Sequence, residues 1–170
     1  MIILESERLL FRDHEAADLD AYCAMEADPE VRRYVGVAPR TREAAERKFR
    51  NGLDRPESNR LWMWGTVYKP DGCYIGRCGV YPHFTLSGPV PGEGALGFYL
   101  ARAYWGRGLA TEAGRALVNF GFTELGLKRI VTAVQVGNDA SVRVLEKLGF
   151  RVERTEIGEA RSFYHFELLP

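Results

Sequence analysis

One segment of ten residues, YWGRGLATEA at 104–113, has residue types and spacing suited to the binding of a phosphate group. It follows an expected strand and opens an expected amphipathic helix. Gly106 and Gly108 lack Cβ atoms, so backbone N–H groups beside them can approach an anion closely. The free N–H groups and the dipole at a helix start favour phosphate at the same place. Arg102 and Arg107 add cations suited to a pyrophosphate or a 3′-phosphate.

The same glycines could instead ease a strand-to-helix turn that binds nothing, and the local sequence leaves both interpretations open. A Walker A loop requires Gly-Lys followed by Ser or Thr, which the sequence lacks. A dinucleotide-binding fingerprint requires a third glycine where Thr111 stands. It also requires an acidic residue at the end of the next strand, where Val136-Gly137 stand. Neither motif therefore describes this segment.

Length and charge exclude several classes of protein. The 170 residues suit one domain, residues 1–170, with a single substantial core. Because 23 Lys and Arg residues balance 23 Asp and Glu residues, we expect no direct nucleic-acid binding. No apolar run approaches the ~20 residues that cross a bilayer. Residues 1–8 lack the basic and apolar regions of a signal peptide, so we expect a cytoplasmic protein without a membrane partner.

The cysteines and histidines are too scattered to predict a metal site, and no metal is expected. The odd number of cysteines is typical of free thiols in a reducing compartment. These residues are Cys23, Cys73, Cys78, His14, His83 and His165.

The first hundred residues predict a strand, three helices and a hairpin. Asp18, Asp28 and Thr41 are the expected N-caps of the helices. Lys69-Pro70-Asp71-Gly72 supplies the hairpin turn. The glycine- and proline-rich stretch 87–94 is expected to be a surface loop. The expected ranges are strand 7–12, helices 18–27, 28–34 and 41–52, and strands 61–69, 73–83 and 95–101.

The second half alternates strands and helices. We expect a helix over 108–124, a strand over 128–136, and a helix that Asn138 caps and Gly149 ends. Strands near 150–157 and 162–169 follow. The strand–helix–strand unit implies a parallel pair bridged by the helix 108–124. The pattern predicts a mixed α/β sheet with helices on both faces.

Three ordered segments resemble the GNAT superfamily of acetyltransferases. Residues 96–113 resemble its acetyl-CoA motif, whose loop Q/R-x-x-G-x-G/A maps onto Trp105 through Ala110. Trp105 departs from the first position, and this variant is similar to the branch containing ribosomal-protein N-terminal acetyltransferases. Residues 7–31 resemble the opening of that branch, and 138–150 its later helix.

The resemblance implies one GNAT-like domain with a mostly antiparallel sheet of six or seven strands, flanked by helices. Its central parallel pair would splay around acetyl-CoA. Backbone groups of Phe98 and Leu100 would pair with pantetheine, and the loop from Trp105 would hold the pyrophosphate. Asn138 would line the pantetheine arm, with Ser141 near the sulfur. The implied cofactor-binding set is Phe98, Leu100, Arg102, Trp105, Gly106, Arg107, Gly108, Leu109, Ala110, Thr111, Asn138 and Ser141.

Acetyl transfer to an amine requires that a proton be removed, since amines are mostly protonated near neutral pH. Family members often carry an acid where Ala95 stands. Glu93 shares Ala95's face if the strand extends that far, and is the candidate base. His83 and water-mediated deprotonation are alternatives. Ser141 is the candidate proton donor to the leaving thiolate, although it could equally be an ordinary residue of the first helical turn.

The acceptor stays open between a small-molecule amine and a protein N-terminus. Strand aromatics could line an acceptor groove or could belong to the core. These are Trp62, Trp64, Tyr81 and Phe84. A noncatalytic acyl-CoA sensor is the alternative function, with a nucleotide-binding regulator as a third interpretation. The chain is expected to be a monomer or a homodimer.

Overall fold

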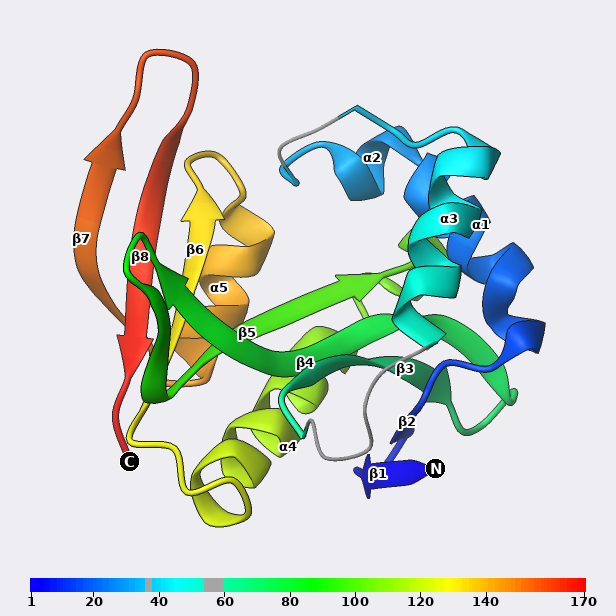
Figure 1. The fold of residues 1–170 in the computed structure, drawn as a ribbon, viewed down its shortest axis with the longest axis horizontal. Helices are drawn as coiled ribbons and strands as arrows, with labels where there is room; N and C mark the ends of the chain where they lie inside the picture. Colours follow the sequence, from blue (N-terminus) through cyan, green and yellow to red (C-terminus); the bar gives the residue numbers. More distant parts are fainter. Residues whose placement is uncertain (36–37, 54–59) are drawn as a thin grey trace.

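A computed structural model describes residues 1–35, 38–53 and 60–170. Its strands form one eight-stranded sheet in the order β1-β2-β3-β4-β5-β6-β8-β7 (Figure 1). The strands are β1 Ile2–Glu5, β2 Leu9–Arg12, β3 Trp62–Tyr68, β4 Cys73–Thr85, β5 Gly88–Leu100, β6 Arg129–Gln135, β7 Arg151–Ile157 and β8 Ser162–Leu168. The helices are α1 Leu19–Ala27, α2 Pro29–Arg32, α3 Arg42–Leu53, α4 Leu109–Thr123 and α5 Asp139–Lys147, with 3₁₀ turns at Ala16–Asp18 and Arg102–Tyr104.

The mixed, mostly antiparallel sheet with a parallel β5–β6 pair is confirmed, although the expectation of six or seven strands is wrong. The strand that the sequence did not indicate is β1. It has four residues, and its pairing with β2 is irregular between Ile2 and Leu4. So short a segment carries too little alternation to be recognised as a strand.

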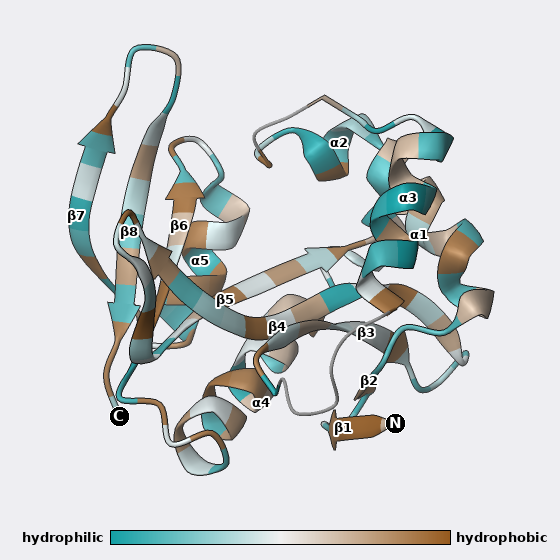
Figure 2. Ribbon diagram, in the orientation of Figure 1, coloured by the Kyte–Doolittle hydropathy of each residue, from teal (hydrophilic) through white to brown (hydrophobic). Residues whose placement is uncertain are grey.

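Helices cover both faces of the sheet, which therefore has a hydrophobic core on each side. Leu109 and Leu117 of α4 pack with Trp64 of β3 and Leu96 of β5 on one face. On the other face α1, α2 and α3 enclose a smaller core: Tyr22, Cys23, Met25, Val31, Ala45 and Phe49. In Figure 2 the central strands β4 and β5 alternate hydrophobic and hydrophilic residues, whereas the edge strand β7 is exposed along its whole length.

The prediction of a surface loop at 87–94 is wrong, because residues 88–94 are the first half of β5. They pair with β4 through Pro82↔Gly94 and Thr85↔Gly88, across a bulge between Pro82 and Phe84. The register of β5 with β6 begins only at Glu93, so the prolines of this stretch lie where β5 has a free edge. Proline is tolerated there because its missing N–H breaks no ladder.

Two of the three N-caps predicted in the N-terminal half are confirmed by hydrogen bonds. The Asp28 carboxylate accepts from Glu30 N at 2.8 Å, and Thr41 Oγ1 accepts from Ala44 N at 3.3 Å. Asp18 stands at the N-cap of α1 without a side-chain cap bond. Its carboxylate binds the Arg12 guanidinium instead, at 2.7 and 2.8 Å. Both carboxylate oxygens are thus engaged, since Oδ2 also accepts from Glu15 N at 2.8 Å, and two bonds to a guanidinium add geometric fit to charge.

No helix within the described ranges is long and apolar enough to cross a membrane. In the same part of the chain, no group of three or more His, Cys, Asp or Glu residues could hold a metal ion.

Candidate functional site

The parallel strands β5 and β6 pair over only three residues and then separate. Their register runs from Glu93↔Arg129 to Ala95↔Val131, whereas β5 continues to Leu100 and β6 to Gln135. Both strands therefore end at the same edge of the sheet, with a gap opening toward that edge. The helix that follows each strand, α4 or α5, also begins there. The carboxyl ends of parallel strands are where such sheets bind ligands.

Backbone groups of Phe98 and Leu100 face this gap. Ala101 N donates to Ile75 O of the β4 side at 2.8 Å, and successive residues of a strand direct their backbone groups to opposite edges. The Leu100 carbonyl is already engaged, because it accepts a 2.7 Å hydrogen bond from the Trp105 indole N–H. Trp105 thus fixes the loop against the end of β5.

The loop before α4 has a backbone that favours glycine at two positions. Gly106 and Gly108 both have left-handed backbones, with φ of +74° and +78°. Residues that carry a Cβ atom rarely adopt this backbone conformation, which explains why glycine occupies both positions. Helix α4 begins directly after Gly108, its N-cap residue, which has no side chain with which to cap the first N–H groups. These groups remain free for a ligand.

Charged and aromatic side chains brace the loop. Arg8 Nη1 donates to Arg107 O at 3.1 Å, and the Arg107 guanidinium lies 5.1 Å from the Tyr104 ring centroid. Glu112 of α4 accepts from the Arg8 N–H and Nε–H, each at 2.7 Å. Arg102 and Arg107 are exposed on the loop, so their charges are available to an anion.

Across the gap, α5 begins at the predicted cap. Asn138 Oδ1 accepts from Ser141 N at 3.3 Å, so Asn138 caps α5 as expected. Ser141 is half-buried in the first turn of this helix. The two predicted residues are therefore adjacent and lie just beyond the end of β6.

Glu93 and His83 are brought together by the β4–β5 hairpin. Because β5 includes Glu93, its side chain lies on the same face of the sheet as that of Ala95. This is the condition for Glu93 to be the candidate base. His83 Nδ1 lies 2.8 Å from Glu93 Oε2, and Arg129 Nη1 lies 3.4 Å from Glu93 Oε1. Arg129 also pairs with Glu153 and Glu167, so Glu93 belongs to an ionic network rather than standing alone.

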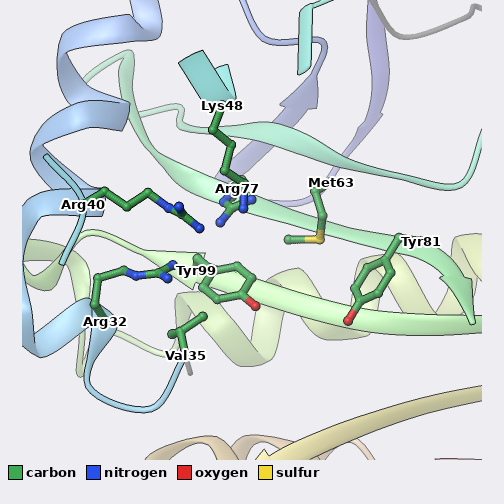
Figure 3. A pocket seen from close by; sticks show the side chains of 8 residues that line it. All are labelled: Arg32, Val35, Arg40, Lys48, Met63, Arg77, Tyr81 and Tyr99. Atoms are coloured by element: carbon green, nitrogen blue, oxygen red, sulfur yellow. The ribbon is translucent and has the colours of Figure 1, made fainter. Parts of the chain in front are cut away.

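A pocket of about 400 Å³ opens on the face of the sheet that α1, α2 and α3 cover (Figure 3). Its lining residues are Arg32, Val35, Arg40, Lys48, Met63, Arg77, Tyr81 and Tyr99. Burial raises the pKa of Tyr81 to about 12, so its hydroxyl keeps its proton at neutral pH. Of the four strand aromatics considered from sequence, Tyr81 lines this pocket. Trp64 is fully buried in the core, and Phe84 is 63% exposed.

Sequence reasoning missed the cations of the pocket, which are Arg32, Arg40, Lys48 and Arg77. They come from α2, the segment before α3, α3 itself and β4. No local motif links residues so far apart in the chain, and the balanced net charge concealed the cluster.

Comparison with known proteins identifies the family. The model of the acetyltransferase (GNAT) domain matches residues 8–151, so the chain belongs to this family of acetyltransferases. An uncharacterized N-acetyltransferase p20 from Bacillus licheniformis is 34% identical over 154 residues, covering 90% of this chain and 84% of that protein. The fold and the relatives define an acetyltransferase enzyme.

Solved structures agree on the fold. The crystal structure of a GNAT acetyltransferase from Bacillus anthracis has a TM-score of 0.84 at 24% identity, covering 99% of this chain and 98% of that one. A ribosomal-protein-S5-alanine acetyltransferase from Vibrio fischeri has a TM-score of 0.79 at 19% identity, covering 99% and 96%. A spermidine N-acetyltransferase from Vibrio cholerae, in complex with CoA and spermine, has a TM-score of 0.77 at 17% identity, covering 96% of each chain.

Proposed function

We propose that the protein transfers an acetyl group from acetyl-CoA to a primary amine by direct attack on the thioester. The observation that carries this proposal is the separation of β5 from β6, with the uncapped start of α4 at the mouth of the gap. The gap offers strand-edge hydrogen bonds to an extended pantetheine arm. The helix start offers free N–H groups to a pyrophosphate.

Each part of the site has a proposed role in binding. Gly106, Gly108 and the first N–H groups of α4 hold the pyrophosphate, with Arg102 and Arg107 adding charge. The further residues of this loop-to-helix cradle are Trp105, Leu109, Ala110 and Thr111. Across the gap, Asn138 lines the pantetheine arm. Acetyl-CoA supplies an acetyl group activated as a thioester.

On the gap edge of β5, the Phe98 and Leu100 N–H groups remain available to pantetheine. Because the Leu100 carbonyl already accepts a hydrogen bond from Trp105, we expect pantetheine to pair with the Leu100 N–H. A backbone N–H of β5 would also donate to the oxyanion that forms at the thioester carbon.

We propose the His83–Glu93 pair as the group that accepts the amine proton. A carboxylate at Nδ1 favours the tautomer whose Nε2 is free to accept a proton. Glu93 would thus act through His83. Ser141 would donate a proton or a hydrogen bond to the departing sulfur.

The same proposal covers the acceptor, the cellular location and the oligomeric state. The names of structural relatives include both a ribosomal-protein and a spermidine acetyltransferase, so fold likeness alone does not select between a protein N-terminus and a small amine. The loop variant at Trp105 favours the ribosomal-protein branch. We propose a cytoplasmic monomer or homodimer that binds neither nucleic acid nor membrane.

The test is release of free thiol from acetyl-CoA across a panel of amines and short peptides, with the N-acetyl product identified by mass. We expect stoichiometric thiol and N-acetyl product with at least one amine. Tight acetyl-CoA binding with no release above background would instead favour the noncatalytic sensor. ATP or NAD protecting the fold from heat better than acetyl-CoA would favour the nucleotide-binding regulator.

A further inference from the structure

The pocket beside β5 carries more positive charge than its surroundings neutralise. Three guanidiniums converge on one carboxylate, that of Glu26, which is only 1% exposed. Arg32 Nη1 lies 3.1 Å and Arg40 Nε 2.8 Å from Glu26 Oε2, and Arg77 Nη2 lies 2.8 Å from Oε1. Three positive charges thus share one negative charge.

Lys48 adds a fourth cation at the rim of the same pocket. Desolvation and then the nearby guanidiniums of Arg77 and Arg40 lower the pKa of Lys48. None of the eight lining residues is acidic. Figure 3 shows Arg32 and Arg40 extending from the helical layer toward the side where Arg77 and Lys48 lie.

Such a cluster is costly without a compensating anion. Two of its guanidiniums, those of Arg32 and Arg77, retain a buried Nε–H that has no hydrogen-bond partner among the described residues. The Arg77 guanidinium gains some stabilisation 4.6 Å from the Tyr99 ring centroid. This contact leaves the donors unsatisfied, and an unpaired buried donor costs free energy. A carboxylate in the pocket would balance this excess positive charge.

We propose that the acceptor is an amine that carries a carboxylate near its amino group, and that this pocket binds the carboxylate. The inference rests on the proposed function, because it names the acceptor class of the same site. A polycationic amine such as spermidine would be repelled by the same cluster. The volume of about 400 Å³ suits a compound of amino-acid size or the first residues of an acidic peptide.

The two ends of the pocket differ in their chemistry. Its cations lie toward one end, and Met63 and Tyr81 lie at the other (Figure 3). A Cβ placed on Gly97 would lie 3.0 Å from Met63 Sδ and 3.1 Å from the Tyr81 ring, so this end of the pocket abuts β5. Gly97 is two residues past the last β5–β6 pair, where the gap begins. Tyr99 of β5 lines the cationic end beside Arg77, so an amine whose carboxylate is held there would lie along the part of β5 that borders the gap.

The test compares matched pairs of acceptors. Amino acids with neutral side chains are assayed against their α-amides, and peptides beginning Ala-Glu against those beginning Ala-Gln, with spermidine included. The amide has the less basic amine, which is more often neutral, so a preference for the acid cannot come from amine basicity. We expect kcat/KM at least about tenfold higher for the carboxylate member, the effect of one charge-assisted contact. The free amino acids and the acidic peptides separate the two sources of the carboxylate.

Lys48→Gln removes one charge from the rim without breaking a contact to Glu26, and Arg47→Gln on the same helix is the matched control outside the pocket lining. Lys48→Gln should lower the ratio of kcat/KM for the carboxylate member to kcat/KM for its amide about tenfold. Arg47→Gln should leave this ratio unchanged.

Equal rates within the pairs, or a preference for spermidine, would overturn the proposal while leaving the acetyltransferase function intact. If no amine is turned over, the proposal is tested by ligand binding instead of by activity. An N-acetylamino acid should then raise the melting temperature more than its amide in wild type but not in Lys48→Gln. Equal shifts would overturn the proposal.

Discussion

Gly108 permits a direct test of the phosphate cradle, because two nearly isosteric side chains can be placed there with opposite expectations. Gly108→Asp introduces an anion at the start of α4, whereas Gly108→Asn introduces a neutral amide of the same size. The φ of +78° excludes most residues, but Asp and Asn tolerate this region better than others. A Cβ at Gly108 meets only Arg8 Nη2, at 3.7 Å, so both variants have room.

The expected magnitude follows from Coulomb's law. A carboxylate about 5 Å from a phosphate charge repels it by about 1 to 3 kcal/mol as the effective dielectric falls from 80 to 20. This repulsion weakens binding about 5- to 150-fold for each phosphate charge. The left-handed backbone costs each variant roughly 1 kcal/mol of stability, and the cost should be nearly equal for the two.

The assay is the dissociation constant of acetyl-CoA by calorimetry, with far-ultraviolet circular dichroism to show that both variants are folded. Gly108→Asn should bind within a few-fold of wild type. Gly108→Asp should bind at least about fivefold more weakly than Gly108→Asn at low salt, with the difference shrinking as salt is added. Equal affinity in the two folded variants would refute the cradle.

Three further substitutions test other parts of the account. Ser141→Ala should lower kcat about a hundredfold with little change in acetyl-CoA affinity, and an unaltered rate would remove Ser141 from the chemistry. Glu26→Gln should destabilise the fold by about 3 kcal/mol in urea unfolding, because it leaves three guanidiniums without their counter-ion. A loss below about 1 kcal/mol would contradict this role of the Glu26 carboxylate. Although burial alone would raise the pKa of Glu112, hydrogen bonds from Ser6 and Arg8 lower it. The resulting stability is present above the unfolded pKa and lost as pH falls through the folded one. Unfolding of Glu112→Gln should therefore differ from wild type at pH 7 and converge with it below about pH 4; a difference independent of pH would contradict this role.

Local signals in the sequence were sufficient for much of the fold. The Asn138 cap and the loop-to-helix turn at Gly106 and Gly108 depend on residues within a few positions of one another, and both occur where predicted. The parallel β5–β6 pair follows from a helix between two strands. The first half of β5 was mistaken for a loop because its glycines and prolines indicate turns. Only pairing with β4, a tertiary contact, makes it a strand.

The candidate site divides in the same way. The loop and both helix starts are encoded in contiguous segments, so the sequence indicates them directly. The cations of the pocket come from α2, the segment before α3, α3 and β4, and are separated by up to 45 positions, between Arg32 and Arg77. The pairing of His83 with Glu93 depends on the hairpin register, which the sequence leaves open.

The position of acetyl-CoA between β5 and β6, with its pyrophosphate at the start of α4, is tested most directly by amide hydrogen exchange. Exchange is measured residue by residue with and without acetyl-CoA. The account predicts that the Phe98 and Leu100 amides and those of residues 106–111 become protected, while the amides of the exposed edge strand β7 do not change. Protection confined to other elements, or none at saturating acetyl-CoA, would contradict it.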